Sequence, residues 1–223
     1  MKIFVITDIH SKYETILNYL KKNESSNDFD KIIVTGDITN FGPENLVGDI
    51  LDKLSDYGEV YAIPGNCDPK NITELIDNSR AINLHDNILV LDDLVLVGFG
   101  GSNKTPFDTP NEFDEEIIYE KLNRFKKDLI ENKTTILVTH VPPVNTGTDK
   151  TETDLHVGST SVRKIIEETQ PTINICGHVH ESIAVDKIQN TIIINPGDAA
   201  TGHACILEII DDNQIKYELI EIE

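Results

Sequence analysis

Short apolar runs, rich in β-branched residues and bounded by polar residues, glycine or proline, alternate along this chain with longer amphipathic stretches. Apolar runs of this kind predict buried strands. They lie at residues 3–6, 31–35, 60–63, 94–97, 135–139 and 173–176. Apolar positions at helical spacing predict helices between them, at residues 11–22, 43–55, 114–132 and 159–169. The alternation of strands and helices predicts an α/β fold.

The C-terminal part has a different pattern, in which strand-like runs follow one another without helices between them. These runs lie at residues 182–186, 191–195, 204–210 and 215–222. Their short connections suit antiparallel pairing, so we expect a mixed sheet, or a pair of sheets, with outer helices. Residues 98–111 show no periodic pattern and predict a long loop, which is uncommon in a compact domain unless it serves a function. No repeat or linker divides the chain, and we expect one domain over residues 1–223.

Composition and charge narrow the class of protein. Hydrophobic residues make up 39% of the 223 positions, and no apolar run approaches the roughly 18 residues that would span a bilayer. Three widely separated cysteines fit a reducing compartment better than a disulfide framework. We therefore expect a cytoplasmic protein without a membrane partner. The formal charge of -20 disfavours long nucleic acids as partners, because their binding depends on lysine and arginine.

Polar side chains that could bind a metal follow five of the predicted strands at the point where each strand ends. They occur in Asp8-Ile9-His10, Gly36-Asp37, Pro64-Gly65-Asn66, Thr139-His140 and Gly177-His178-Val179-His180. In extended backbone a two-residue spacing directs Asp8 and His10 to the same side. Taken alone, each motif is more often a turn or a structural histidine than a ligand. Because ligand sites in α/β proteins gather at the carboxyl ends of strands, the five motifs together predict a convergent site.

In order and approximate spacing, these motifs resemble those of the calcineurin-like metallophosphoesterases, and the resemblance extends over residues 1 to about 200. Three further segments are similar to those of small prokaryotic Icc-related predicted phosphoesterases: Gly100-Gly101-Ser102-Asn103, His156-Val157-Gly158-Ser159 and Asn195-Pro196-Gly197. The resemblance implies a four-layer α/β/β/α sandwich. It also implies hydrolysis of a phosphate ester by a hydroxide that bridges two metal ions.

By the same resemblance, seven side chains would hold two divalent ions. One ion would be bound by Asp8, His10, Asp37 and His180, and the other by Asp37, Asn66, His140 and His178. Asp37 would therefore bridge the two ions. Mixed carboxylate, amide and imidazole donors suit manganese, which we expect first, and also iron, nickel, cobalt or zinc. Two such ions would make the pocket locally positive, and so able to attract a phosphate ester to an acidic protein.

The third motif departs from the family pattern, because Cys67 stands where many relatives have a histidine paired with the following aspartate. A thiol is a weak donor and does not replace an imidazolium, so Asp68 loses its usual partner and is left to shape the turn. His156 could protonate the leaving group instead, or could be a loop residue without a function. The candidate catalytic residues are therefore Asp37, Asn66, His140, Cys67, Asp68 and His156.

We expect from this resemblance a metal-dependent phosphoric ester hydrolase that acts on a small phosphate ester, a phosphodiester in preference to a monoester. Two other readings stay open. The first is a non-catalytic interaction module of the same fold. The intact set of metal-ligand residues counts against this reading. The second is phosphomonoesterase or nuclease activity, and the acidic charge together with the lack of a basic stripe counts against a nuclease that acts on long substrates.

Overall fold

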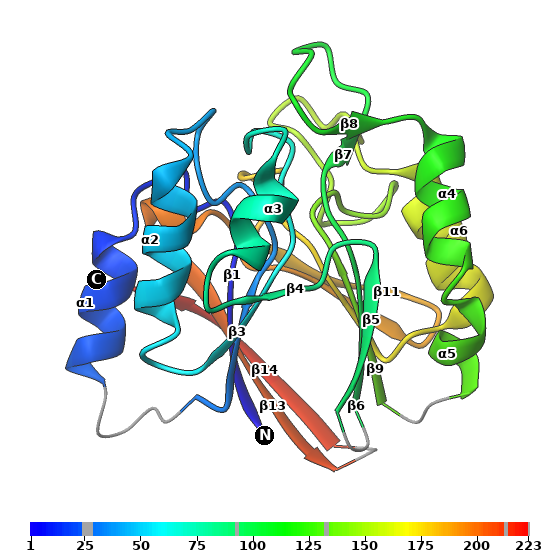
Figure 1. Ribbon diagram of the computed structural model, residues 1–223. Helices are drawn as coiled ribbons and strands as arrows, with labels where there is room; N and C mark the ends of the chain where they lie inside the picture. The colour runs from blue at the N-terminus through cyan, green and yellow to red at the C-terminus, as the bar shows by residue number, and fades with distance from the viewer. Residues whose placement is uncertain (24–28, 92–93, 132–133, 212–213, 223) are drawn as a thin grey trace.

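The computed structural model describes residues 1–23, 29–91, 94–131, 134–211 and 214–222. Two six-stranded mixed sheets pack against each other, and helices cover the outer face of each sheet (Figure 1). The strand order is β14-β13-β1-β2-β3-β4 in the first sheet and β11-β12-β10-β9-β6-β5 in the second. The predicted four-layer α/β/β/α sandwich is confirmed by this arrangement.

The first sheet has a parallel part that is buried on both faces. Its strands are β1 (Lys2–Ile6), β2 (Lys31–Val34), β3 (Glu59–Ala62), β4 (Ile82–Asn83), β13 (His203–Asp211) and β14 (Gln214–Glu221). The first four run parallel, and β13 and β14 pair antiparallel, as the C-terminal pattern predicts. Its outer face packs against α1 (Glu14–Lys22), α2 (Asn45–Leu54) and α3 (Ile72–Asp77). Strands covered on both faces read as continuous apolar runs, which explains the sequence pattern.

The second sheet repeats this plan with other elements. Its strands are β5 (Asn87–Leu91), β6 (Leu94–Phe99), β9 (Thr134–Thr139), β10 (Ile173–Ile175), β11 (Ala184–Ile188) and β12 (Thr191–Asn195). Its outer face packs against α4 (Glu115–Asn123), α5 (Lys126–Glu131) and α6 (Thr160–Thr169). Of the helices in the described ranges, none is both long and apolar enough to cross a membrane.

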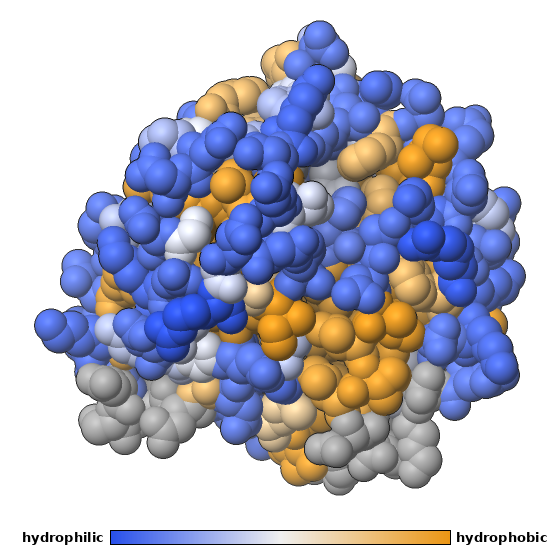
Figure 2. Space-filling model, viewed as in Figure 1, coloured by the Kyte–Doolittle hydropathy of each residue, from blue (hydrophilic) through white to orange (hydrophobic). Residues whose placement is uncertain are grey.

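The core between the sheets follows the two-residue period of strands. In β1, Ile3 and Val5 face the second sheet, whereas Phe4 and Ile6 face the helices. The inter-sheet core reaches the surface near β5, where Leu89 is only partly buried and packs against it. Figure 2 shows apolar surface gathered over the part of this face where Figure 1 places β5 and β6.

Two expectations differ from the structure. The helix predicted over residues 114–132 is interrupted between α4 and α5, and residue 132 lies outside the described residues. Near the interruption, Lys121 and Arg124 both pair with Asp86, a tertiary contact that no glycine or proline marks in the sequence. The loop predicted over residues 98–111 contains β7 (Ser102–Asn103), which pairs with β8 (Glu112–Phe113).

Candidate metal centre

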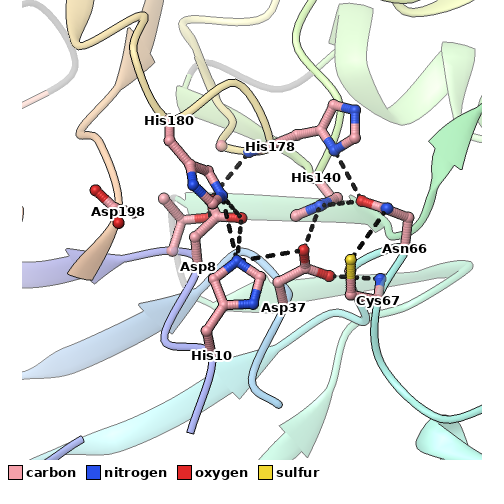
Figure 3. A network of polar contacts seen from close by, with 12 residues as sticks. Asp8, His10, Asp37, Asn66, Cys67, His140, His178, His180 and Asp198 are labelled. Atoms are coloured by element: carbon pink, nitrogen blue, oxygen red, sulfur yellow. Dashed lines mark hydrogen bonds and ion pairs between the residues drawn. The ribbon is translucent and has the colours of Figure 1, made fainter. Parts of the chain in front are cut away.

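The structure brings all seven predicted ligands together at the carboxyl ends of strands from both sheets (Figure 3). The first sheet contributes Asp8 and His10 after β1, Asp37 after β2 and Asn66 after β3. The second sheet contributes His140 after β9, and His178 and His180 after β10. Packing of the two sheets thus joins motifs that lie more than a hundred residues apart in the sequence.

Three of the predicted ligands, Asp8, His10 and His180, form a first cluster. His180 Nε2 lies 3.2 Å from Asp8 Oδ1 and 3.2 Å from His10 Nε2. The other carboxylate oxygen, Asp8 Oδ2, accepts hydrogen bonds from the Thr7 hydroxyl at 2.6 Å and the His178 backbone N–H at 3.0 Å. The scaffold therefore holds one oxygen of Asp8 and leaves Oδ1 facing the two imidazoles.

A second cluster forms around the amide oxygen of Asn66. Asn66 Oδ1 lies 2.9 Å from His140 Nε2 and 2.7 Å from His178 Nδ1. His140 Nδ1 lies 2.8 Å from the Thr35 carbonyl oxygen, which can only accept, so Nδ1 carries the proton and Nε2 presents its lone pair. Asn66 Nδ2 donates to Thr109 Oγ1 at 3.0 Å and to Cys67 Sγ at 3.4 Å, which orients the amide.

Asp37 lies between the two clusters. Its Oδ2 is 3.7 Å from His10 Nε2 and 3.6 Å from His140 Nε2, whereas its Oδ1 accepts the Cys67 backbone N–H at 2.8 Å. A single oxygen of Asp37 thus faces candidate ligands of both clusters, a position from which the carboxylate could bridge two ions.

Unusual backbone positions this set of side chains. Asp8, His10, Asp37 and His178 all have positive φ, between 45° and 69°. Asp8 and His10 do converge, as predicted. The predicted cause, an extended backbone, is wrong, because both residues have left-handed backbone. Left-handed non-glycine residues cost free energy and often cluster at functional sites.

Close approach of the ligand-bearing loops depends on glycine. A Cβ atom on Gly65 would lie 2.0 Å from Asp37 Oδ1, and one on Gly177 would lie 1.9 Å from Thr7 Oγ1. Both contacts are too short for any other residue unless the loops move. The glycines therefore allow Asp37 and Asp8 to approach the neighbouring motifs.

The electrostatics of the centre fit a bound cation. Burial, together with the charges of Asp8 and Asp68, raises the pKa of Asp37 well above its usual range. Burial lowers the pKa of His178 to about 3, so its ring is neutral and can act as a ligand. Amide and carboxylate oxygens and imidazole nitrogens lie only 2.7–3.8 Å from one another. Cations among them would relieve this crowding, and the donor types suit a divalent transition metal.

The remaining candidates have structural partners of their own. The Asp68 carboxylate is fully buried and accepts the backbone N–H groups of Ile38, Thr39 and Gly65 at 3.2, 2.8 and 2.9 Å. It therefore ties the loop of Asp37 to the loop of Asn66. Burial and the nearby Asp37 charge raise the pKa of the Cys67 thiol, which is neutral at physiological pH.

His156 pairs with Asp149 and not with any of the seven ligands. Its Nδ1 lies 2.6 Å from Asp149 Oδ1, and Asp149 is fully buried. The neighbours of His156 in the chain, Leu155 and Val157, line a cavity beside His178. The pairing was not predicted, because Asp149 belongs to no motif in the sequence.

Two further residues near the centre were also missed. Thr109 holds the amide of Asn66, and Asp198 favours the charged forms of His10 and His180 through its own charge. Figure 3 shows Asp198 beside His180. Asp198 directly follows the segment Asn195-Pro196-Gly197, which was noted for its resemblance, so the sequence did hold a signal for it.

Comparison with known proteins identifies the family of this chain. The family model for calcineurin-like phosphoesterase matches residues 1–182. An uncharacterized protein of Methanocaldococcus jannaschii is 46% identical over 201 residues, which cover 88% of each chain. An uncharacterized metallophosphoesterase of Campylobacter jejuni is 27% identical over 165 residues, which cover 70% of this chain and 42% of that protein.

Among solved structures, a protein of Thermus thermophilus has the same fold. The two structures superpose with a TM-score of 0.77 at 14% sequence identity, over 100% of this chain and 99% of that one. The match to the family model covers more than half of the chain, and the fold and the convergent carboxylate, amide and imidazole groups agree with it. The chain therefore belongs to the calcineurin-like phosphoesterase family and is a metal-dependent phosphoesterase.

Proposed function

We propose that this protein hydrolyses a small phosphodiester, using two divalent ions held by the seven side chains of the centre, with manganese as the ion we expect first. The observation that carries this proposal is the position of Asp37 Oδ2, which faces His10 Nε2 at 3.7 Å and His140 Nε2 at 3.6 Å. When bound, two ions supply Lewis-acid activation of water and neutralise charge on the phosphoryl oxygens. Asp8 and Asn66 each keep one oxygen directed at the centre, because other atoms of their side chains are held by the scaffold.

The charges around the centre favour a diester over a monoester. A phosphodiester carries one negative charge near neutral pH, whereas a monoester carries about 1.5 to 2. In the part of the chain that the structure describes, no hydrogen bond or ion pair of the seven ligands involves lysine or arginine. The thiol at Cys67 is neutral as well. A centre whose candidate ligands contact no lysine or arginine suits the less charged substrate, and the formal charge of -20 favours a small one.

A substrate panel tests this proposal. Metal-free protein is reconstituted separately with manganese, iron, nickel, cobalt, zinc and magnesium, and assayed on bis(4-nitrophenyl) phosphate and 4-nitrophenyl phosphate. We expect hydrolysis that depends on a transition metal, with the higher kcat/KM for the diester and with little activity in Asp37→Ala. A higher kcat/KM for the monoester would contradict the diester assignment. Protein that binds two ions but hydrolyses neither ester would favour an interaction module.

The proton donor to the leaving group is tested with esters graded by leaving-group pKa. The roles of Cys67, Asp68 and His156 stay predictions. An aryl oxide departs with little help, whereas an alkoxide needs an acid whose help is typically worth about 10²–10⁴-fold. If no side chain supplies the proton, Cys67→His beside Asp68 should speed alkyl esters selectively. If His156 supplies it, His156→Ala should slow alkyl esters selectively. A dependence on leaving-group pKa that neither substitution changes would eliminate both proposals, the missing donor at Cys67 and the substitute donor at His156.

A further inference from the structure

A cavity of about 540 Å³ opens beside the candidate metal centre. Residues 103–107 form one wall, Leu155 and Val157 belong to a second wall, and His178 and Val179 line the cavity where it meets the centre. This volume lies in the range of sites that bind small molecules. Because His178 contacts Asn66 at 2.7 Å, the cavity and the second ligand cluster share a side chain.

The first wall is held in place by one carboxylate. Glu112 accepts hydrogen bonds from the backbone N–H and hydroxyl groups of both Thr105 and Thr109. Thr105 Oγ1 also accepts the backbone N–H of Phe107 at 3.1 Å, which links the exposed aromatic residue to this network. Thr109 in turn holds the amide of Asn66 at 3.0 Å. The wall and a candidate metal ligand are therefore positioned by the same loop.

The second wall is held by Asp149. Its buried carboxylate accepts the backbone N–H groups of Asn145, Thr146 and Gly158 at 3.1, 2.9 and 3.0 Å, in addition to the bond with His156. Each wall is thus organised around a carboxylate with several donors, and such networks make a cavity largely pre-formed.

The chemistry of the lining favours an uncharged, largely apolar ligand. Phe107 is 80% exposed and Leu155 is 61% exposed, although both are large apolar side chains. Water-exposed apolar groups that gather around a cavity are typical of binding sites. The two charged residues of the lining, Lys104 and Glu181, have opposite signs, so the lining carries no net charge that would select an ion.

We propose that this cavity binds the organic group of the phosphoester substrate, and that this group is uncharged and largely apolar, such as an aromatic ring. The proposal rests on the phosphoesterase function proposed above. A phosphoryl group at the candidate ligands would lie next to His178, where the cavity begins. Phe107 and Leu155 are then the residues that determine specificity, through apolar contact with that group.

Binding of two phosphonates tests this proposal without hydrolysis. Methylphosphonate and benzylphosphonate share the phosphoryl group and differ only in the organic group, and neither is cleaved by a phosphoesterase. Their Kd values are measured by calorimetry on manganese-loaded native protein and on the double variant Phe107→Ala/Leu155→Ala. The control is Ile130→Ala, which removes an exposed apolar side chain from α5. The exposure of Phe107 and Leu155 means that their truncation should leave the fold intact.

We expect native protein and the control to bind benzylphosphonate about tenfold more tightly than methylphosphonate, or better, from burial of the ring. In the double variant this ratio should fall towards one, while the Kd for methylphosphonate stays the same. The cavity proposal would be overturned if native protein bound the two phosphonates equally well. It would also be overturned if the double variant kept the native preference for benzylphosphonate. In either case, binding of methylphosphonate would still support the metal centre as a phosphoryl site. If neither phosphonate binds, the cavity proposal fails by itself, because the diesterase function is tested separately by the substrate panel.

Discussion

Replacing Asp68 should show how strongly one buried carboxylate holds the loops of the metal centre. Asp68 Oδ2 accepts the N–H groups of Gly65 and Ile38, and Oδ1 accepts the N–H and hydroxyl groups of Thr39. In Asp68→Asn the new NH₂ group is best placed against the hydroxyl of Thr39. One backbone N–H then has no acceptor, which costs about 1–3 kcal/mol in the free energy of unfolding. Asp68→Ala leaves three such N–H groups unpaired, and we expect a loss of about 3 kcal/mol or more.

The measurement is urea unfolding in the presence of a chelator, so that bound metal does not mask the difference in stability. The matched control is Asp49→Ala on the exposed face of α2, which should change the free energy of unfolding by no more than about 0.5 kcal/mol. With metal added back, calorimetry on Asp68→Asn should show the ion of the second cluster bound about 10–100-fold more weakly. Unfolding of both Asp68 variants at the same urea concentration as the control would refute this role of the Asp68 carboxylate.

Two further predictions concern Thr109 and His85, which are not among the seven candidate ligands. Thr109→Val removes the oxygen acceptor of Asn66 Nδ2 and leaves only Cys67 Sγ, so the ion of the second cluster should bind about tenfold more weakly in a calorimetric titration. Unchanged affinity would contradict the role of the Thr109 bond. His85 is half-buried, its Nδ1 accepts the Gly100 N–H at 2.9 Å, and desolvation of the ring lowers its pKa from 6.5 to about 4. As the pH falls below 6.5, His85 is therefore protonated in the unfolded chain before it is protonated in the folded protein. The free energy of unfolding should consequently fall by up to about 3 kcal/mol between pH 6.5 and pH 4. In urea unfolding with chelator present, the free energy of unfolding of His85→Gln should fall less than that of native protein between pH 6.5 and 4. An equal fall in both proteins would show that His85 does not cause the loss of stability.

The architecture could be predicted because its main signals are local. The strands that carry the ligands are short apolar runs that end at Asp, Asn or His, and both features are visible without knowledge of tertiary contacts. The six-residue helix α3 was missed, since so short a segment offers too few positions for a helical period. The interruption between α4 and α5 was missed as well. Near it, Lys121 and Arg124 pair with Asp86, and this contact joins parts of the chain that are distant in the sequence.

The surroundings of the centre could be predicted only in part, for a related reason. Asp149 and Glu112 resemble ordinary loop carboxylates in the sequence, and only the fold shows that each gathers several donors. The left-handed backbone at Asp8 and His10 was also hidden, because aspartate and histidine adopt positive φ only occasionally. The ligand types are thus apparent in the sequence, whereas the backbone and the partners that orient them depend on tertiary structure.

The number of metal ions bound per chain tests the central claim most directly. Elemental analysis combined with calorimetric titration under saturating manganese should give two ions for the native protein. Because Asp37 Oδ2 faces both clusters, Asp37→Ala should weaken the binding of both ions, whereas Asn66→Ala should weaken mainly one. A stoichiometry of one or none at saturation, or equal occupancy in the two variants, would contradict a centre in which Asp37 bridges two ions.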